Sequence, residues 1–308
     1  MARSVALRAS YIAIGANACL LVLKATATGL SDSLTIFSET INSLADMVAA
    51  VVTLLCVYWA WQSADESHPF GHRRAEPIAG LVVALLTGIL GFEVCRTAVL
   101  DLLRGDLPQR IGPYPIAALC ITAVLKAVLY LYFRRRGHEL NSPALRATAV
   151  DCRNDVVVAL QGLIAVVVAE LHLPLLDVIA ALLVGSYILY GGHRIGMENI
   201  DYLMGKEPEP GLLRQVEHAA AAIPHVQFVT DVKGHYVGPF VHVELTAVVD
   251  GALSTADSHD ICEAVRGAVE TFPVIDRAFV HISPPQFVGP PAGGAPGGPV
   301  EVQSKRVG

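Results

Sequence analysis

Apolar residues gather in six long runs within roughly the first two thirds of the chain. The connections between these runs are short near 31–33, 104–111 and 171–172, and longer and basic near 62–75 and 134–143. A helix needs about 20 apolar residues to cross the hydrocarbon core of a bilayer. We therefore predict an α-helical membrane protein with six transmembrane helices. The predicted spans are 10–30, 34–61, 76–103, 112–133, 144–170 and 173–192.

After residue 205, mixed polar and apolar positions replace the long runs. GLLRQVEHAAAAIP predicts a helix that ends before Pro224, and two β-branched stretches follow around a Gly-Pro turn. Ser254 or Thr255 can cap a second helix, and IDRAFVHIS predicts a last strand. This α-β-β-α-β order predicts a small C-terminal α+β domain. The expected divisions are an N-terminus (1–9), a transmembrane domain (10–195), a linker (196–209), the αββαβ domain (210–283) and a disordered Pro/Gly-rich tail (284–308).

The composition agrees with a membrane protein. Hydrophobic types make up 53% of the 308 residues and charged types 16%, with a mean hydropathy of +0.51. Soluble domains average about 45–50% apolar and about 25% charged. A net charge of −6, without a concentrated basic run, argues against nucleic-acid binding. The six cysteines form no C-x-x-C pair, so we predict neither a disulfide framework nor a thiolate zinc site.

Basic residues sort to one side of the predicted membrane. With the N-terminus in the cytosol, ten Lys and Arg residues near the spans face the cytosol, and only Arg104 and Arg110 face outward. The positive-inside rule therefore favours both termini in the cytosol. The ten are Arg3, Arg8, Arg73, Arg74, Arg134, Arg135, Arg136, Arg146, Arg194 and Lys206.

Two predicted spans carry polar side chains that a bilayer makes costly. An ionisable residue at the centre of a spanning helix costs about 2.5–3.5 kcal/mol on insertion scales and indicates function by default. Asn42 and Asp46 are one turn apart in the second span, and Asp151 and Asp155 repeat this spacing in the fifth. If the pairs face each other, a divalent cation would balance their charge. Glu39 continues the face of Asp46 outward, along a candidate exit path. The alternative is hydrogen bonding between helices without a metal.

The loop between the second and third spans, ADESHPFGHRRAEP, contains a second candidate metal site. Asp65, His68 and His72 are ligand types at ligand spacing. A solvated polar loop is the alternative.

Three segments carry a family resemblance: NSLAD in the second span, DESHPFGHRRAEPIAG in the following loop and DCRND in the fifth span. With them the chain resembles the cation diffusion facilitator family of divalent-metal transporters. The resemblance implies a homodimer in the lipid of the inner (plasma) membrane, with a cytosolic, metallochaperone-like (ferredoxin-like) αββαβ domain. It also implies export of Zn²⁺, Mn²⁺, Fe²⁺, Co²⁺ or Ni²⁺ from the cytosol, in exchange for protons, by alternating access. By position, it implies a transport site at Asn42, Asp46, Asp151 and Asp155 and a loop site at Asp65, His68 and His72.

In the C-terminal domain, the resemblance implies metal ligands at His259 and His281. The chain departs from metal-binding members at three further ligand positions, which hold Thr230, Thr246 and Ser283. His235 and His242 are nearby but do not match the ligand positions. Surface or interface histidines remain the alternative.

The predicted transport site contains oxygen ligands and no imidazole. Zinc-transporting members commonly place a His at one of the four positions, where this chain has Asp151 and Asn42. Oxygen ligands suit harder ions such as Mn²⁺, whereas imidazole favours Zn²⁺, Co²⁺ and Ni²⁺. The arrangement is also similar to that of bacterial manganese exporters. Our hypothesis is Mn²⁺ export, with Fe²⁺ next and Zn²⁺ third, by carboxylates that exchange protons for metal and need no cofactor.

Three other classes of protein, a metal sensor, an intramembrane enzyme and a channel, fit the sequence less well. A membrane metal sensor would need a larger output domain. An intramembrane enzyme would need a nucleophile and a base, or an aspartate dyad, whereas these aspartates pair within single helices. A channel is less suited to a buried, charged site than alternating access is.

Overall fold

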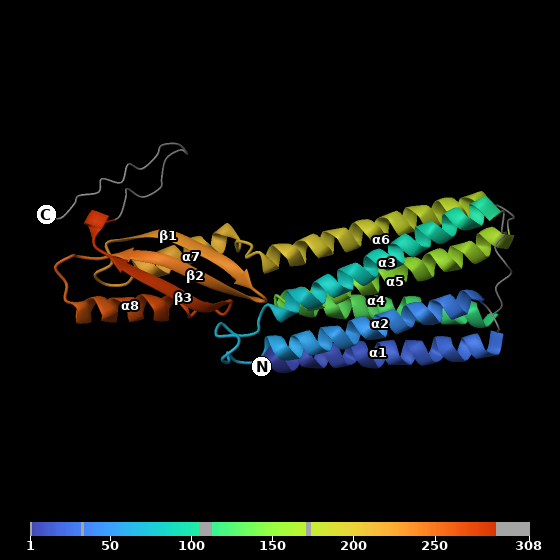
Figure 1. The fold of residues 1–308 in the computed structure, drawn as a ribbon, viewed down its shortest axis with the longest axis horizontal. Coiled ribbons are helices and arrows are strands. Elements are labelled where there is room, and N and C mark those ends of the chain that lie inside the picture. Colours follow the sequence, from blue (N-terminus) through green and yellow to red (C-terminus); the bar gives the residue numbers. More distant parts are fainter. Residues whose placement is uncertain (1, 32–33, 105–112, 171–173, 288–308) are drawn as a thin grey trace. The chain divides into compact units, whose positions relative to one another are not determined.

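The computed structural model describes residues 2–31, 34–104, 113–170 and 174–287 (Figure 1). The chain divides into two compact units, one holding the first six helices and the other most of the remaining elements. The six long helices are α1 (Ala2–Ser31), α2 (Leu34–Ala60), α3 (Ala75–Arg104), α4 (Pro113–Glu139), α5 (Pro143–Glu170) and α6 (Pro174–Leu203). The other elements are α7 (Pro210–Ala221), β1 (Phe228–Val237), β2 (Phe240–Val248), α8 (Thr255–Val269), β3 (Ile275–Ser283) and a 3-10 turn (Pro285–Phe287).

Five helices in the described residues are long and apolar enough to cross a membrane: α1, α2, α3, α4 and α6. Helix α5 has a similar length, 28 residues, but its first half carries Arg146, Asp151, Arg153 and Asp155. These charges explain why α5 does not stand out by composition alone. The predicted fold class, a helical membrane region followed by a small C-terminal α+β domain, is confirmed.

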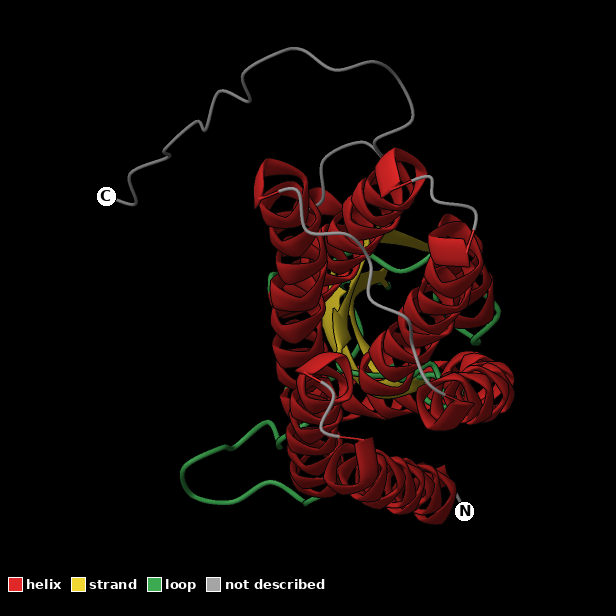
Figure 2. Ribbon diagram, turned by 90° about the vertical axis from the view of Figure 1, so that its right-hand side faces the viewer, coloured by secondary structure: helices red, strands yellow, loops and turns green. Residues whose placement is uncertain are grey.

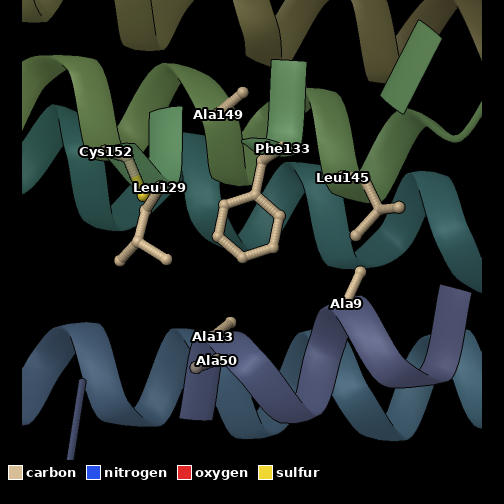
Figure 3. Close-up of a cluster of buried hydrophobic side chains, with 8 residues drawn as sticks. All are labelled: Ala9, Ala13, Ala50, Leu129, Phe133, Leu145, Ala149 and Cys152. Atoms are coloured by element: carbon tan, nitrogen blue, oxygen red, sulfur yellow. The ribbon is translucent and has the colours of Figure 1, made fainter. Parts of the chain in front are cut away.

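Within the first unit, α1 runs along α2, α4 along α5, and α3 along α6 (Figure 1). Figure 2 views these helices nearly end-on. A cluster of buried apolar side chains joins α1, α2, α4 and α5, and the fully buried ring of Phe133 points from α4 toward the alanines of α1 and α2 (Figure 3). Small alanines let the backbones approach while larger side chains fill the remaining space. The members are Ala9, Ala13, Ala50, Leu129, Phe133, Leu145, Ala149 and Cys152.

Helices α3 and α6 approach each other at two glycines. A Cβ atom at Gly185 would lie 2.4 Å from Sγ of Cys95 and 3.0 Å from the carbonyl oxygen of Gly91. Neither glycine has room for a Cβ atom, so the two helices approach each other closely here, as small residues permit in membrane proteins.

The C-terminal unit contains a three-stranded sheet in the order β1-β2-β3. Strands β2 and β3 are parallel, so the chain must cross over between them, and α8 lies in this connection. Ser254 caps α8 by accepting a hydrogen bond from the backbone N–H of Asp257. Val216 of α7, Val265 of α8 and Val243 of β2 are fully buried and belong to the apolar interior.

The first and last long helices exceed their predicted spans. Helix α1 begins at Ala2, inside the predicted N-terminal segment 1–9, and α6 continues to Leu203, inside the predicted linker 196–209. The added turns of α6 carry polar residues such as Arg194 and Glu198. A hydropathy pattern detects only the apolar part of a helix. The predicted last span therefore ends at residue 192, whereas α6 continues to Leu203.

Candidate functional site

Helices α2 and α5 bring three carboxylates together inside the membrane unit. Asp46, Asp151 and Asp155 each offer an oxygen atom, and these three atoms lie within 4.8 Å of one another. Asn42 lines a small cavity together with Asp46 and Asp155. The cavity volume is about 20 Å³, enough for one water-sized particle. Of the four predicted transport-site residues, the three aspartates therefore converge, and Asn42 lines the cavity beside two of them.

Neighbouring helices support these side chains. Thr87 of α3 donates a hydrogen bond from its hydroxyl to Oδ1 of Asp151, at 3.3 Å. Asn17 of α1 donates from Nδ2 to the backbone carbonyl of Asp46, also at 3.3 Å. Hydrogen-bond partners of this kind orient metal ligands and thereby influence which metal a site binds and how tightly.

A buried lysine that the sequence interpretation missed also reaches this group. Nζ of Lys126, on α4, lies 2.9 Å from Oδ2 of Asp46 and 2.5 Å from Oδ2 of Asp155. Only 1% of the Lys126 side chain is exposed. The available signal was a single charge inside the predicted span 112–133, which indicates function by default. A second lysine, Lys24 of α1, is buried and lines the same cavity.

The predicted loop residues also come together. Asp65, His68 and His72 place one ligand atom each within 4.8 Å of one another. Oδ1 of Asp65 lies 3.5 Å from Nδ1 of His68, and Oδ2 lies 3.4 Å from Nε2 of His72. A turn at Gly71, with a φ of +83°, lies between the histidines and favours glycine. The loop therefore presents one carboxylate and two imidazoles to one point.

Local hydrogen bonds hold Asp65 in its charged form. The backbone N–H of His68 donates to Oδ1 at 2.6 Å, and the hydroxyl of Ser67 donates to the same oxygen at 3.0 Å. These donors lower the pKa of Asp65 below its usual value, with the His68 N–H contributing most and the two imidazoles adding a smaller effect. A deprotonated carboxylate is the form that binds a metal.

The two C-terminal histidines are separate from these groups. His259 on α8 and His281 on β3 are exposed. Among the described residues, neither belongs to a set of three or more close candidate ligands. Strand register places Thr246, which has no ligating nitrogen or carboxylate, directly opposite His281.

Two further residues singled out in the sequence are His242, in the C-terminal domain, and Glu39, on α2. His242 is buried, with Nε2 3.6 Å from Oδ2 of Asp276 and its ring centroid 5.7 Å from that of His235. The candidate exit-path residue Glu39 lies on α2, but its side chain falls outside the described residues.

Long apolar helices that bring three carboxylates together, followed by a small α+β domain, are the arrangement expected of a membrane cation transporter. Residues 10–204 match the family model described as the cation efflux transmembrane domain, and residues 208–285 match the cytoplasmic domain of cation efflux proteins. The chain therefore belongs to the cation efflux family, and the resemblance to cation diffusion facilitators is confirmed. Its activity is efflux of divalent metal cations, and it is not an enzyme.

Curated relatives match the chain along most of its length. An uncharacterized transporter of Methanocaldococcus jannaschii is 29% identical over 271 residues, covering 88% of this chain and 95% of the relative. The manganese efflux system proteins MneS and MneP of Bacillus subtilis are each 28% identical, covering 89% and 90% of this chain and 94% and 95% of those proteins. A solved C-terminal domain of MamM is 27% identical, covering 24% of this chain and 95% of that domain, with a TM-score of 0.24.

Proposed function

We propose that this protein exports Mn²⁺ from the cytosol, with Fe²⁺ as the next-best substrate. The observation that carries the proposal is the ligand set within the helices: Asp46, Asp151 and Asp155 converge, with Asn42 beside them and no imidazole among them. Carboxylate and amide oxygens suit Mn²⁺, and withholding nitrogen ligands is how a site disfavours metals that would otherwise bind more tightly. The names of MneS and MneP support the same metal.

Exchange for protons follows from the chemistry of these ligands. Carboxylates must be deprotonated to bind a metal, so loading releases protons and unloading on the other side allows protons to return. Asp46, Asp151 and Asp155 are the groups proposed to couple the two fluxes, by alternating access. The distribution of basic residues supports a cytosolic location for both termini, in the plasma (inner) membrane. The match of residues 208–285 to a cytoplasmic cation-efflux domain supports a homodimer joined through that domain.

Export of Zn²⁺, Co²⁺ or Ni²⁺ is the second candidate, and the loop site is the observation that favours it. His68 and His72 converge with Asp65 there, and imidazole prefers these later metals. The loop residues nevertheless lie outside the membrane helices, so we assign them to capture or regulation rather than to selection of the transported ion.

The proposal is tested by metal flux in proteoliposomes. The purified full-length protein is reconstituted, and uptake of Mn²⁺, Fe²⁺, Co²⁺, Ni²⁺ and Zn²⁺ is followed with an enclosed metal indicator under a proton gradient. We expect Mn²⁺ to be taken up fastest, and Asp155→Asn to abolish uptake while the protein remains folded. Asp201→Asn is the matched control, because Asp201 pairs with Lys206 at 3.3 Å near the end of α6. A fully active Asp155→Asn variant would contradict the assignment of the transport site. Faster uptake of Zn²⁺ than of Mn²⁺ would contradict the proposal that Mn²⁺ is the preferred substrate.

A further inference from the structure

The ammonium of Lys126 lies between two of the three converging carboxylates. It is 2.9 Å from Asp46 on α2 and 2.5 Å from Asp155 on α5, while the side chain is almost completely buried. One cation supplied by α4 thus bridges the two helices that supply the metal ligands.

A divalent ion that uses the same carboxylates must compete with this ammonium. The three candidate ligand oxygens lie within 4.8 Å of one another, so an ion bound by all three sits close to Nζ of Lys126. Two cations at such short range repel each other strongly where bulk water is excluded. The adjoining cavity of about 20 Å³ has room for one water-sized particle, too little for water layers that would screen the two charges.

We propose that Lys126 is a tethered counter-ion of the transport site, a role that rests on the function proposed above. In the metal-free protein its ammonium takes the place of the transported ion between Asp46 and Asp155. When a divalent ion binds, the ammonium leaves at least one of these carboxylates, and it returns when the ion departs. Lysine suits this role because its charge is compact and its four-carbon stem is flexible.

The wall of the cavity contains an acceptor for the displaced ammonium. Thr122 precedes Lys126 by one turn on α4, and both residues line the cavity. Oγ1 of Thr122 is buried and makes no hydrogen bond within the part of the chain that the structure describes. A hydroxyl oxygen at this position can accept a hydrogen bond from Nζ once the carboxylates are occupied.

A tethered ammonium affects both affinity and selectivity. Displacing it costs part of the metal's binding free energy, so the ion is held less tightly than by the carboxylates alone, and its release is assisted. A monovalent ion such as K⁺ would only exchange one unit charge for another, whereas a divalent ion increases the positive charge at the site. Lys126 therefore discriminates against the monovalent cations of the cytosol.

The test measures Mn²⁺ binding to the purified full-length protein by isothermal titration calorimetry. All variants carry Asp65→Ala, His68→Ala and His72→Ala, so that the loop does not contribute. Lys126→Met keeps the length of the side chain and removes the competing charge, and we expect at least tenfold tighter Mn²⁺ binding. We also expect 100 mM K⁺ to weaken Mn²⁺ binding more in Lys126→Met than in the parent protein.

Lys126→Arg and Arg153→Met complete the design. A guanidinium pairs with two carboxylates more firmly than an ammonium does, so Lys126→Arg should weaken Mn²⁺ binding at least tenfold. Arg153→Met removes a charge from α5 whose guanidinium lies 5.2 Å from the ring of Tyr187 and donates to Asn154, and it should change the affinity less than threefold.

Unchanged or weaker Mn²⁺ binding in Lys126→Met overturns the proposal, as does an equal gain in Arg153→Met. If Lys126→Met does not fold, Lys126→Arg decides the question, and unchanged or tighter binding in that variant rejects the counter-ion role. Flux through the wild-type protein separates this result from the proposed function. If the wild-type protein transports Mn²⁺ and Lys126→Met binds it with unchanged affinity, only the counter-ion role of Lys126 is rejected. If the wild-type protein transports no divalent ion, the proposed export function is rejected.

Discussion

The hydroxyl of Thr87 on α3 donates a hydrogen bond to the carboxylate of Asp151 on α5, at 3.3 Å. This bond connects α3 to the carboxylate group and gives a proposed metal ligand a hydrogen-bond partner on another helix. Thr87→Val keeps the shape of the side chain and removes the donor. The loss of one hydrogen bond is worth about 1 kcal/mol, so we expect about fivefold weaker Mn²⁺ binding in calorimetry. Thr148→Val is the control, because the Thr148 hydroxyl donates a hydrogen bond within α5, to the carbonyl of Ala144. Equal affinity in both variants would show that Thr87 does not orient Asp151.

Asp151 also offers a test of metal choice. Asp151→His places an imidazole among the oxygen ligands, and imidazole favours Zn²⁺ over Mn²⁺. We expect the ratio of Zn²⁺ to Mn²⁺ uptake in proteoliposomes to rise at least tenfold. Asp151→Asn keeps an oxygen ligand, so it should lower the flux without raising that ratio. An unchanged ratio in Asp151→His would contradict the argument from ligand softness.

The loop site has a predictable pH response. Hydrogen bonds from the His68 N–H and the Ser67 hydroxyl lower the pKa of Asp65 in the folded loop. Their stabilising effect is therefore fully present above the usual pKa of an unfolded aspartate, and it is lost as the pH falls through the lowered pKa. Ser67→Ala removes one donor, so we expect the pKa of Asp65 in the folded loop to move upward, the total stabilisation to become smaller, and its loss to be complete at a higher pH. Carboxyl ¹³C NMR of the metal-free protein measures this shift, with Ser63→Ala as the control from the same loop. The same pKa in both variants would refute the role of Ser67.

The crossing of α3 and α6 predicts a stability effect. A Cβ atom at Gly185 would meet Sγ of Cys95 at 2.4 Å, which forces the helices apart or displaces the cysteine. We expect Gly185→Ala to lower the free energy of unfolding by about 1–3 kcal/mol, the usual cost of overpacking. In Gly88→Ala, on α3, the new Cβ atom meets no atom of the described residues within 4 Å, so the variant should be as stable as the wild type or slightly more stable. Thermal unfolding in detergent compares the two, and equal midpoints would argue against close contact at this crossing.

Local signals made much of the fold predictable. The sequence offers Ser254 or Thr255 as the cap of a helix, and in the structure α8 begins at Thr255 with Ser254 as its cap. The pairs Asn42–Asp46 and Asp151–Asp155 were recognisable because the helical repeat places residues four apart on one face. The repeat shows which face of each helix carries the pair. It does not show that the two faces lie against each other, because that depends on how the helices pack.

The contact of Lys126 with the carboxylates could not be predicted from the sequence. It is a single charge in an apolar run, with no ligand type one turn away to mark it. Its two carboxylate partners are on other helices, and α4 brings it to them through the packing of Phe133 and Leu129 against α1, α2 and α5. Contacts of this kind depend on tertiary structure and have no periodic signature in the chain.

The small cavity beside Asp46 and Asp155 has a consequence for the speed of transport. A hydrated divalent ion carries several waters, and a space of about 20 Å³ cannot receive them, so the ion must shed most of its hydration shell to enter. Ions also cannot queue in single file and push one another forward, as they do in a channel filter. Under the proposed alternating access, each conformational cycle would deliver one ion, and we expect the turnover number to be limited by helix motions on the microsecond-to-millisecond scale rather than by diffusion.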